Sequence, residues 1–286
     1  IRTRRGDFSL NSAGIEAQIQ PNKLRLQFQR RPCREINLEE CTEPDPPHAD
    51  FPHDWGGYTD VIHVDFKIPS EHLIYGERFD AEMQIFHLHP SRRRTPTVVS
   101  LMKACANCHN DILQDVIDEF QITFDNHTAE CATRMRRDMK MISRVHRLLG
   151  KNVTSSVDHD TSWKFSTSNE APTQTTRRLQ RVFTPYHEQL VPSIHFFGYE
   201  GSLTEPPCSE FVTWFITDVP MEMSYDQLEQ LKRIQFGYVN PHCEKTSIHF
   251  QESNARPIQD TFGRPVWRCT PQDFLADEFM FADGTS

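Results

Sequence analysis

The segment from residue 63 to residue 90, HVDFKIPSEHLIYGERFDAEMQIFHLHP, concentrates the side chains from which metal sites are built. Alternate side chains of a strand point to the same face, so imidazole and carboxylate groups two residues apart can bind one ion. His63 with Asp65, and His87 with His89, have this spacing. One interpretation of the segment is therefore a metal site built on one of these pairs.

The apolar pattern around these residues predicts the strands that position them. In VIHVDFKI, residues 61–68, the even positions are apolar and the odd positions from 63 to 67 are polar, which is typical of a strand with one face on a core. Residues 80–88, DAEMQIFHL, alternate in the same way and predict the return strand of a hairpin. If the polar faces coincide, the expected floor of a cleft consists of His63, Asp65, Lys67, Glu82 and Gln84.

A lysine in the middle of this floor argues against a metal. A protonated lysine is not a ligand, and a glutamine carbonyl is a poor ligand for zinc. An ammonium between the carboxylates of Asp65 and Glu82 is largely neutralised, which lowers the cost of burying it. The pattern therefore predicts a buried salt-bridge network. His87 and His89 lie on the opposite face from Gln84, where we expect a hydrogen-bonded structural role.

The whole chain has the composition of a globular protein. It has 286 residues, 37% of them hydrophobic, with 20 Phe and 4 Trp, and a formal net charge of −9 at pH 7. This length can bury a large core, and the negative charge makes nucleic acid an unfavourable partner. No apolar run approaches the roughly 18 residues of a transmembrane segment, so we expect none. The first residue is Ile1 and not Met, so we expect a processed or truncated end.

Strands are predicted along most of the chain, with two helical segments in addition. Apolar alternation or continuous apolar runs predict strands at residues 23–29, 60–68, 81–88, 95–104, 193–199 and 210–220. Residues 110–121 have helical spacing, with Asn110 or Asp111 as the cap, and residues 224–236 form a second helical segment.

Residues 122–184 are polar, rich in serine and threonine, and are predicted to be an insertion. The stretch RMRRDMKMISRVHRLLGK within them would form a basic amphipathic helix. Its apolar side either packs on the parent domain or docks a protein partner, a second copy or an anionic surface. Residues 270–286 form an acidic tail. Asn126 and Asn152 begin glycosylation sequons.

Eight cysteines, an even number, together with the two sequons favour a secreted protein or an oxidising lumen over the cytosol. CANCH, residues 105–109, matches the attachment pattern for c-type haem, and a CxxC pair can also signal redox or zinc chemistry. The interpretation that we favour is structural disulfides, whose pairing the spacing does not determine. The candidate cysteines are Cys33, Cys41, Cys105, Cys108, Cys131, Cys208, Cys243 and Cys269.

Three segments, the first of them within residues 63–90, resemble the alpha-class carbonic anhydrases. IPSEHLIYGERFDAEMQIFH resembles the hairpin of that family, GYEGSLTEPPCSEFVTW at residues 198–214 resembles its most distinctive segment, and NARPIQ at residues 254–259 resembles a late motif. NSAGIEAQIQPNKLRL is a weaker echo of the N-terminal motif. The resemblance covers roughly residues 9–265 apart from the insertion. It implies a single domain over residues 1–286, built on a large, twisted, mostly antiparallel β-sheet with peripheral helices.

The resemblance also implies where a metal would lie. In family enzymes three histidines hold Zn²⁺, which makes bound water a nucleophile towards carbon dioxide. Aligned through the SEH and AE residues, these histidines fall on Asp65, Lys67 and Gln84, so all three ligands are replaced. We therefore expect no zinc and no other cofactor, as in a divergent, algal-type, carbonic-anhydrase-related branch of this lyase family.

Other residues match the family's machinery by the same alignment. Thr204 matches the hydroxyl that orients zinc-bound hydroxide, Glu71 the carboxylate that accepts its proton, and Glu82 the partner of the third histidine. The pocket wall is matched by Leu203, Val212 and Trp214. Phe86 is larger than the usual family residue, and Glu205 adds a carboxylate. In secreted relatives the cysteine matched by Cys208 bridges to the N-terminal region, so the resemblance makes Cys33 or Cys41 its partner.

Three hypotheses about function follow. The first is a domain that has lost the zinc site and acts in binding or assembly, a secreted pseudoenzyme with disulfides and glycans. The second is a carbonate dehydratase that uses a relocated metal or another mechanism. The third is a subunit of a larger assembly that docks a protein partner or a second copy through residues 122–184.

Overall fold

A computed structural model describes residues 2–4, 8–10, 14–29, 46–51, 59–88, 94–148 and 182–269. The expectations that concern His89, Asn152, Cys33, Cys41 and the acidic tail lie outside these ranges. The strands are β1 (Arg2–Arg4), β2 (Ile15–Gln20), β3 (Lys23–Phe28), β4 (His48–Asp50), β5 (Thr59–Lys67), β6 (Leu73–Ile74), β7 (Glu77–Arg78), β8 (Ala81–Leu88), β9 (Thr95–Cys105), β10 (Phe196–Gly201), β11 (Val212–Thr217), β12 (Met221–Ser224) and β13 (Trp267–Cys269). The helices are α1 (Asp111–Leu148) and α2 (Tyr225–Gly237).

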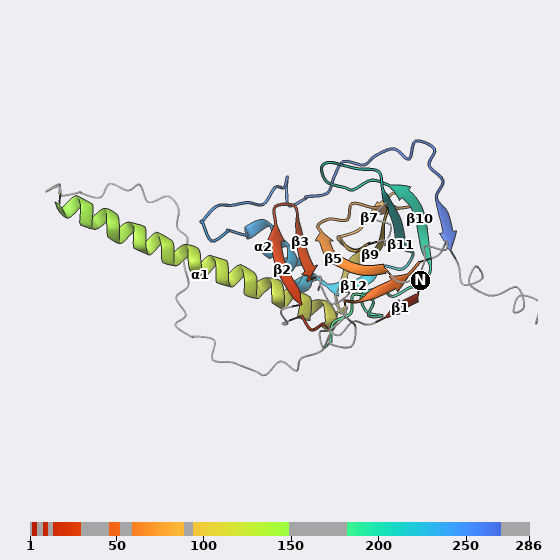
Figure 1. The fold of residues 1–286 in the computed structure, drawn as a ribbon, viewed down its shortest axis with the longest axis horizontal. Coiled ribbons are helices and arrows are strands. Elements are labelled where there is room, and N and C mark those ends of the chain that lie inside the picture. Colours follow the sequence, from red (N-terminus) through yellow and green to blue (C-terminus); the bar gives the residue numbers. More distant parts are fainter. Residues whose placement is uncertain are drawn as a thin grey trace, which may run out of the picture.

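Within the described ranges, eleven strands share one sheet, in which β1, β4, β5, β8, β9, β11, β10 and β13 follow one another. The pairings are antiparallel except where β11 and β12 run parallel to β9. β3 pairs with β5 and carries β2 at its outer edge, and β6 and β7 form a small hairpin of their own. The expected large, mostly antiparallel sheet with peripheral helices is confirmed (Figure 1).

One face of the sheet packs against the helices. Val64 and Phe66 of β5 belong to the large apolar cluster, together with Ile117 and Phe120 of α1 and Leu231 of α2. The rings of Phe66 and Phe120 meet edge to face, with centroids 6.0 Å apart. This face therefore holds the main core, which leaves the opposite side chains of β5 and β8 for the polar floor.

The two helix N-termini are tied together by buried amide groups. Asn110 caps α1, since its Oδ1 accepts a hydrogen bond from the backbone of Leu113 at 3.0 Å. Ser224 caps α2 in a capping box with Gln227. The Gln227 side chain in turn donates to the carbonyl of Asn110 at 2.7 Å and accepts from its N–H at 3.1 Å. These contacts fix the direction in which α1 leaves the sheet.

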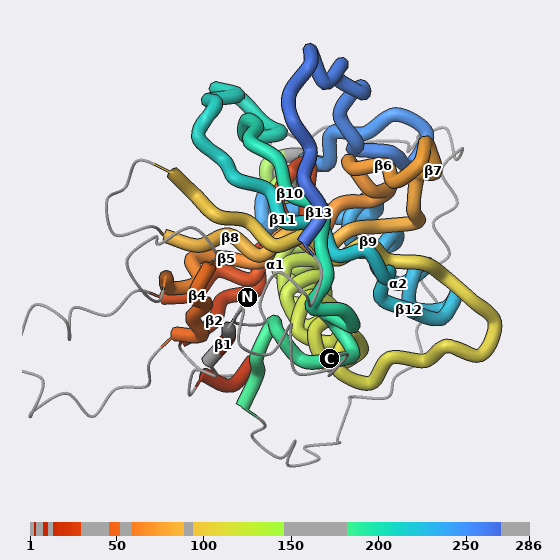
Figure 2. The backbone as a smooth tube through the Cα atoms, turned by 90° about the vertical axis from the view of Figure 1, so that its right-hand side faces the viewer, coloured from red at the N-terminus to blue at the C-terminus, as the bar shows by residue number. Residues whose placement is uncertain are grey.

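α1 joins two segments that were predicted to be separate helices. These are residues 110–121 and the basic amphipathic stretch within residues 122–184. α1 runs without interruption through residue 122, where we expected the insertion to begin. Residues 110–149 contain neither glycine nor proline, so nothing in the chain ends the helix there. Its first half lies beside α2 and the second half projects from the body of the protein (Figure 1). Figure 2 looks nearly along its axis and shows the helix behind the strands.

Candidate functional site

The predicted polar floor is formed by neighbouring residues of β5 and β8. Asp65 is opposite Gln84, and Lys67 is opposite Glu82 in the antiparallel register. His63 is opposite Phe86, next to an irregularity that follows Val61. All four side chains of the two central pairs are buried, with at most 1% of each residue exposed. The expectation that the polar faces of the two strands coincide is confirmed.

Lys67 has a different partner from the one expected. Its Nζ lies 3.7 Å from Oε1 of Glu71, a residue of the turn that follows β5, and makes no ion pair with Asp65 or Glu82 among the described contacts. The prediction of an ammonium between those two carboxylates was therefore wrong. Nζ also has no hydrogen-bond partner in the described part of the chain. Lys67 thus carries a buried charge that is neutralised at a distance and left without a hydrogen bond.

Asp65 is neutralised by β3 instead. Arg25 donates from Nε to Oδ1 at 2.6 Å and from Nη2 to Oδ2 at 2.7 Å, which is the two-pronged geometry of a strong arginine–carboxylate pair. Lys23 Nζ lies 3.3 Å from Oδ2. Burial opposes ionisation of Asp65, but His63, Arg25 and Lys23 outweigh it and lower its pKa to about 2. Asp65 is therefore an anion whose oxygens are already occupied.

His63 is held as a neutral ring beside this ion pair. Its Nε2 accepts a hydrogen bond from Nη2 of Arg25 at 3.0 Å, so the lone pair that would bind a metal is occupied. Burial lowers its pKa to about 4, and the positive charge of Arg25 contributes in the same direction. The ring also lies against Phe86, with centroids 4.6 Å apart. His63 and Asp65 therefore do not form the metal-binding pair that their spacing allows.

Glu82 and Gln84 belong to a hydrogen-bonded chain that leads away from the floor. Glu82 Oε2 lies 3.1 Å from Nδ1 of His72, whose Nε2 is 2.8 Å from the hydroxyl of Tyr199. Burial alone would lower the pKa of His72, but Glu82 and Glu71 raise it above the ordinary value. Gln84 donates to Glu82 and, at 3.3 Å, to Glu71, whereas its Oε1 is buried without a partner in the described residues.

An apolar wall stands beside the polar floor. Phe86, Val212 and Trp214 are buried in a second apolar cluster, and Leu203 packs against it. The rings of Phe86 and Trp214 meet edge to face with centroids 5.9 Å apart. Phe86 therefore takes up space above the floor, as its size leads one to expect.

Comparison with known proteins identifies the kind of domain that carries this site. A sequence model of the eukaryotic-type carbonic anhydrase family matches residues 148–270. A nematode protein named putative carbonic anhydrase 3, from Caenorhabditis elegans, is 42% identical over 71 residues. The chain contains a carbonic-anhydrase-related domain.

The similarity of this carbonic-anhydrase-related chain to named relatives is partial. Human mitochondrial carbonic anhydrase 5B is 38% identical over 80 residues, and putative carbonic anhydrase 2 of Lottia gigantea is 26% identical over 224 residues, which make up 70% of the chain. The matched segments span about a quarter of the nematode and human proteins, 25% and 24%, and 48% of the Lottia protein. The family model begins after β5 and β8.

Two solved structures share the fold over most of the chain. The alpha-carbonic anhydrase of Thermovibrio ammonificans superposes with a TM-score of 0.50 at 19% identity, covering 93% of this chain and 80% of that one. The halotolerant carbonic anhydrase of Dunaliella salina gives 0.51 at 15% identity, with the same coverage. At these identities the likeness concerns the architecture alone.

Thr204, Glu71 and Glu205 surround the edge of the carbonic-anhydrase-like site. Thr204 and Glu71 both line a cavity of about 590 Å³ between the β6–β7 hairpin and residues 256–266. Glu71 Oε1 also accepts from the backbone N–H of Arg256 at 3.4 Å. Glu205 forms an ion pair with Lys23 and accepts from Asn22 at 3.2 Å. The carboxylate added by Glu205 therefore neutralises Lys23 instead of facing solvent alone.

The polar floor does not fit Zn²⁺. Zinc takes deprotonated thiolates, neutral imidazoles or free carboxylates, usually four of them in a tetrahedron. Of the three central side chains, Lys67 is a cation, Gln84 donates to two carboxylates, and both oxygens of Asp65 accept from Arg25. A dication there would also face Lys23 and Arg25. The donor set therefore opposes the metal chemically and electrostatically.

The described residues of the alternative metal sites, at His87 and at Cys105 and Cys108, are also engaged in other contacts. His87 is fully buried, with Nδ1 donating to the carbonyl of Pro96 at 2.9 Å and Nε2 bonded to Tyr186, which is the structural role expected for it. Burial lowers its pKa to about 3. The one group of three ligand-type side chains that lie close enough to share an ion, within the part of the chain described, is Cys105, Cys108 and Glu222.

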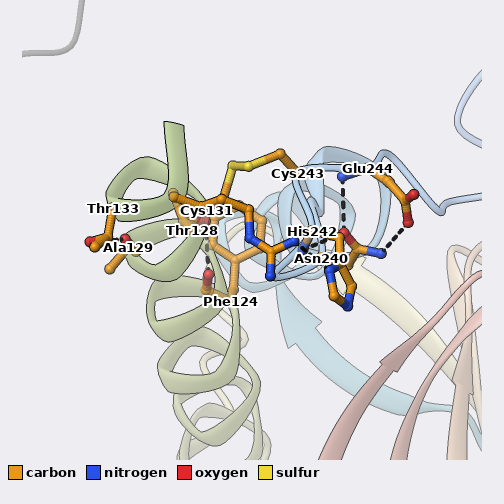
Figure 3. The surroundings of a disulfide bond; sticks show 10 residues. Phe124, Thr128, Ala129, Cys131, Thr133, Asn240, His242, Cys243 and Glu244 are labelled. Atoms are coloured by element: carbon orange, nitrogen blue, oxygen red, sulfur yellow. Dashed lines mark hydrogen bonds between the residues drawn. A yellow bond between two sulfur atoms is a disulfide. The ribbon is translucent and has the colours of Figure 1, made fainter. Parts of the chain in front are cut away.

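The cysteines are explained in part. Cys105 and Cys108 form a disulfide, which favours the structural interpretation of CANCH over haem or zinc. A second disulfide joins Cys131 of α1 to Cys243, across 112 residues of sequence (Figure 3). Cys208 is a free thiol, so the bridge that the family resemblance implied for it is not observed.

Sequence reasoning missed Lys23 and Arg25, which stabilise the ionised carboxylate of Asp65. The signal was present, because Lys23 and Arg25 alternate with Leu24 and Leu26 and so lie on one face of the predicted strand. What was lacking was the neighbour of that strand: β3 pairs with β5, with Arg25 opposite Asp65. His72 and Tyr199 were missed in the same way, since their contact joins residues 127 positions apart.

Proposed function

We propose that this chain is a carbonic-anhydrase-related domain that has lost its zinc site and serves in binding or assembly instead of catalysis. The observation that carries the proposal is the buried ammonium of Lys67, which follows the Asp65–Gln84 pair on the same face of the sheet. By the family alignment these three residues stand where the zinc ligands would be. An ammonium in that position supplies the positive charge of a metal without its chemistry.

The neighbouring groups support the proposal independently of the alignment. Catalysis by a metal-bound hydroxide needs an open coordination position and a ligand set that stays deprotonated and accessible. Here the carboxylate of Asp65 is held by Arg25, and Gln84 is held by Glu71 and Glu82. Phe86 further narrows the space above the floor by its contact with Trp214.

The residues around the site form an ordered, well-packed framework. Glu82, His72 and Tyr199 form a connected chain of hydrogen bonds, and the apolar wall is intact. A site whose chemistry is altered within an ordered framework is what a binding domain needs, because a rigid scaffold presents its surface without an ordering cost. The two disulfides support an oxidising compartment, as proposed for a secreted protein. Among the described helices none is long and apolar enough to span a membrane.

Elemental analysis of the purified chain beside a carbon dioxide hydration assay tests the proposal. We expect less than about one tenth of a zinc per chain and a hydration rate equal to the buffer blank. The zinc content must be measured after dialysis against zinc, so that metal loss during purification is not mistaken for a missing site. Zinc near one per chain, with hydration activity that a chelator removes, would overturn the proposal and favour a dehydratase with a relocated metal.

A further inference from the structure

The outer part of α1 is an exposed surface, which contacts the body of the protein at its base through Arg134 and His242. Every residue from 133 to 145 is exposed, whereas Cys131 is buried and fixed to Cys243 by a disulfide. Figure 3 shows this disulfide where the helix leaves the body, and Figure 1 shows the helix continuing beyond it. We call residues 133–145 the outer segment. Helices in proteins are stabilised mainly by packing of an apolar face, a kind of packing that the outer segment lacks, so a partner is expected to cover it.

The outer segment carries an apolar stripe. At 100° per residue its large apolar side chains fall on one side of the helix, where Asp138, Met141, Ile142 and Val145 also line a shallow hollow. The stripe consists of Met135 (54% exposed), Met139 (60%), Met141 (68%), Ile142 (55%) and Val145 (44%). Clustered apolar exposure of this kind marks a contact surface more often than a solvated face. Methionines are suited to such a surface because they adapt to the shape of a partner.

The charges of the outer segment select the kind of partner. The segment contains one acidic residue, Asp138, and five basic ones, all exposed: Arg134, Arg136, Arg137, Lys140 and Arg144. Two outer segments laid against each other would bring these like charges together, which opposes pairing of one α1 with another. The occupant must therefore be both apolar and acidic.

The chain itself contains a segment with these properties. Residues 270–286, TPQDFLADEFMFADGTS, contain five large apolar residues and four acidic ones, and no lysine or arginine. The apolar residues are Phe274, Leu275, Phe279, Met280 and Phe281. The acidic residues are Asp273, Asp277, Glu278 and Asp283. This tail is complementary to the outer segment in both charge and hydrophobicity.

We propose that the acidic tail of one copy binds the apolar stripe of the outer segment of a second copy. β13, which precedes the tail, lies on the side of the sheet away from the outer segment (Figure 1), so the tail of the same copy starts at the opposite end of the molecule. Each copy then offers one tail and one helix, and a contact of this head-to-tail type forms rings or open chains of copies. The inference rests on the proposed role in binding or assembly and names a second copy of the chain as the partner.

Sedimentation velocity of the full chain tests this contact. We expect the mass to rise with concentration from about 1 to 100 μM at 50 mM salt and the association to weaken at 500 mM salt, because exposed charge pairs are screened. Arg136→Glu with Arg137→Glu, and separately Asp277→Lys with Glu278→Lys, should each weaken association at least about tenfold. The two pairs of changes combined should restore it. Lys103→Glu with Lys232→Glu changes the net charge as the helix variant does, away from the outer segment, and should leave association unchanged.

Three results would overturn the inference. The first is a monomer at every concentration, and the second is an oligomer that neither charge reversal affects. The third is binding of the full chain to phosphatidylserine vesicles with no binding of a synthetic 270–286 peptide, which would make the outer segment a membrane-surface helix. Zinc content and hydration measured on the same samples keep the two proposals separate. A monomer without zinc contradicts only the tail contact, and an oligomer with zinc and activity contradicts only the proposed loss of catalysis.

Discussion

Nζ of Lys67 and Oε1 of Glu71 lie 3.7 Å apart in the buried floor of the site, and Nζ makes no hydrogen bond to any described residue. A buried pair of this kind costs desolvation on both sides and returns little, so its replacement by apolar groups is often neutral or stabilising. Removal of Glu71 alone is a different matter, because the ammonium of Lys67 then remains buried without compensation.

We therefore expect opposite results from two single substitutions. Glu71→Gln should lower the free energy of unfolding by about 3 kcal/mol, because the ammonium of Lys67 loses its nearest anion. Lys67→Met should change it by less than about 1 kcal/mol or raise it, because the carboxylate of Glu71 keeps the hydrogen bonds from Gln84 and from the backbone of Arg256. The double variant should recover most of the loss of Glu71→Gln. Urea denaturation at pH 7 measures all three, and equal losses for the two single variants would show that Lys67 is held by more than Glu71.

The acid stability of the protein should depend on two neutral histidines. His63 and His87 have folded-state pKa values of about 4 and about 3, mainly through burial, whereas an unfolded histidine titrates near 6.5. Between these values the unfolded state binds more protons, so stability is present above pH 6.5 and is lost as the pH falls. Each histidine contributes a slope of roughly 1.4 kcal/mol per pH unit between about pH 6 and pH 4. Asp65 adds its own loss only below about pH 3.8.

Urea denaturation at half-unit intervals from pH 7 to pH 4 measures this slope. His63→Gln should reduce the slope by roughly 1.4 kcal/mol per pH unit, which corresponds to a difference of one bound proton between the unfolded and folded states. His109→Gln is the matched control, because His109 lies on the surface before α1. An unchanged slope in His63→Gln would mean that the ring is already charged in the folded protein, contrary to its hydrogen bond from Arg25.

The strands and helices were easier to predict than the way in which they pack against one another. The alternation in residues 61–68 and 80–88 indicated both strands and the face of each side chain, because a strand repeats every two residues. The same alternation cannot say which strand lies beside which, so the approach of Arg25 to Asp65 was not foreseen. The continuous helix through residue 122 escaped prediction for a related reason. The residues after 121 are more polar and more basic than those of the first helical segment, which looked like a change of structure.

The two disulfides should differ greatly in their effect on stability. The Cys131–Cys243 bond closes a long loop, since the cysteines are 112 residues apart, whereas Cys105 and Cys108 are three apart. Loop-closure entropy predicts a loss of roughly 4 to 5 kcal/mol without the first bond and roughly 1.6 kcal/mol without the second. Urea denaturation of Cys131→Ala/Cys243→Ala and of the matched Cys105→Ala/Cys108→Ala measures both. Equal losses would indicate that the structure near CANCH matters beyond loop closure.

Restoring histidines to the floor tests the correspondence with the zinc ligands and the role of β3 together. Asp65→His, Lys67→His and Gln84→His supply three imidazoles, but the first change also removes the carboxylate that neutralises Lys23 and Arg25. Two cations beside an incoming dication oppose binding. We therefore expect the triple variant to bind zinc weakly.

Adding Lys23→Leu and Arg25→Met to the triple variant should tighten zinc binding at least about tenfold, which is about 1.4 kcal/mol. Competition against a chromophoric chelator measures both affinities, and Lys23→Leu/Arg25→Met without the histidines is the control for new adventitious binding. Tight zinc binding by the triple variant alone would mean that β3 does not set the electrostatics of the floor. No zinc binding by the five-residue variant, in a protein that still folds, would mean that Asp65, Lys67 and Gln84 do not occupy the positions of the family's ligands.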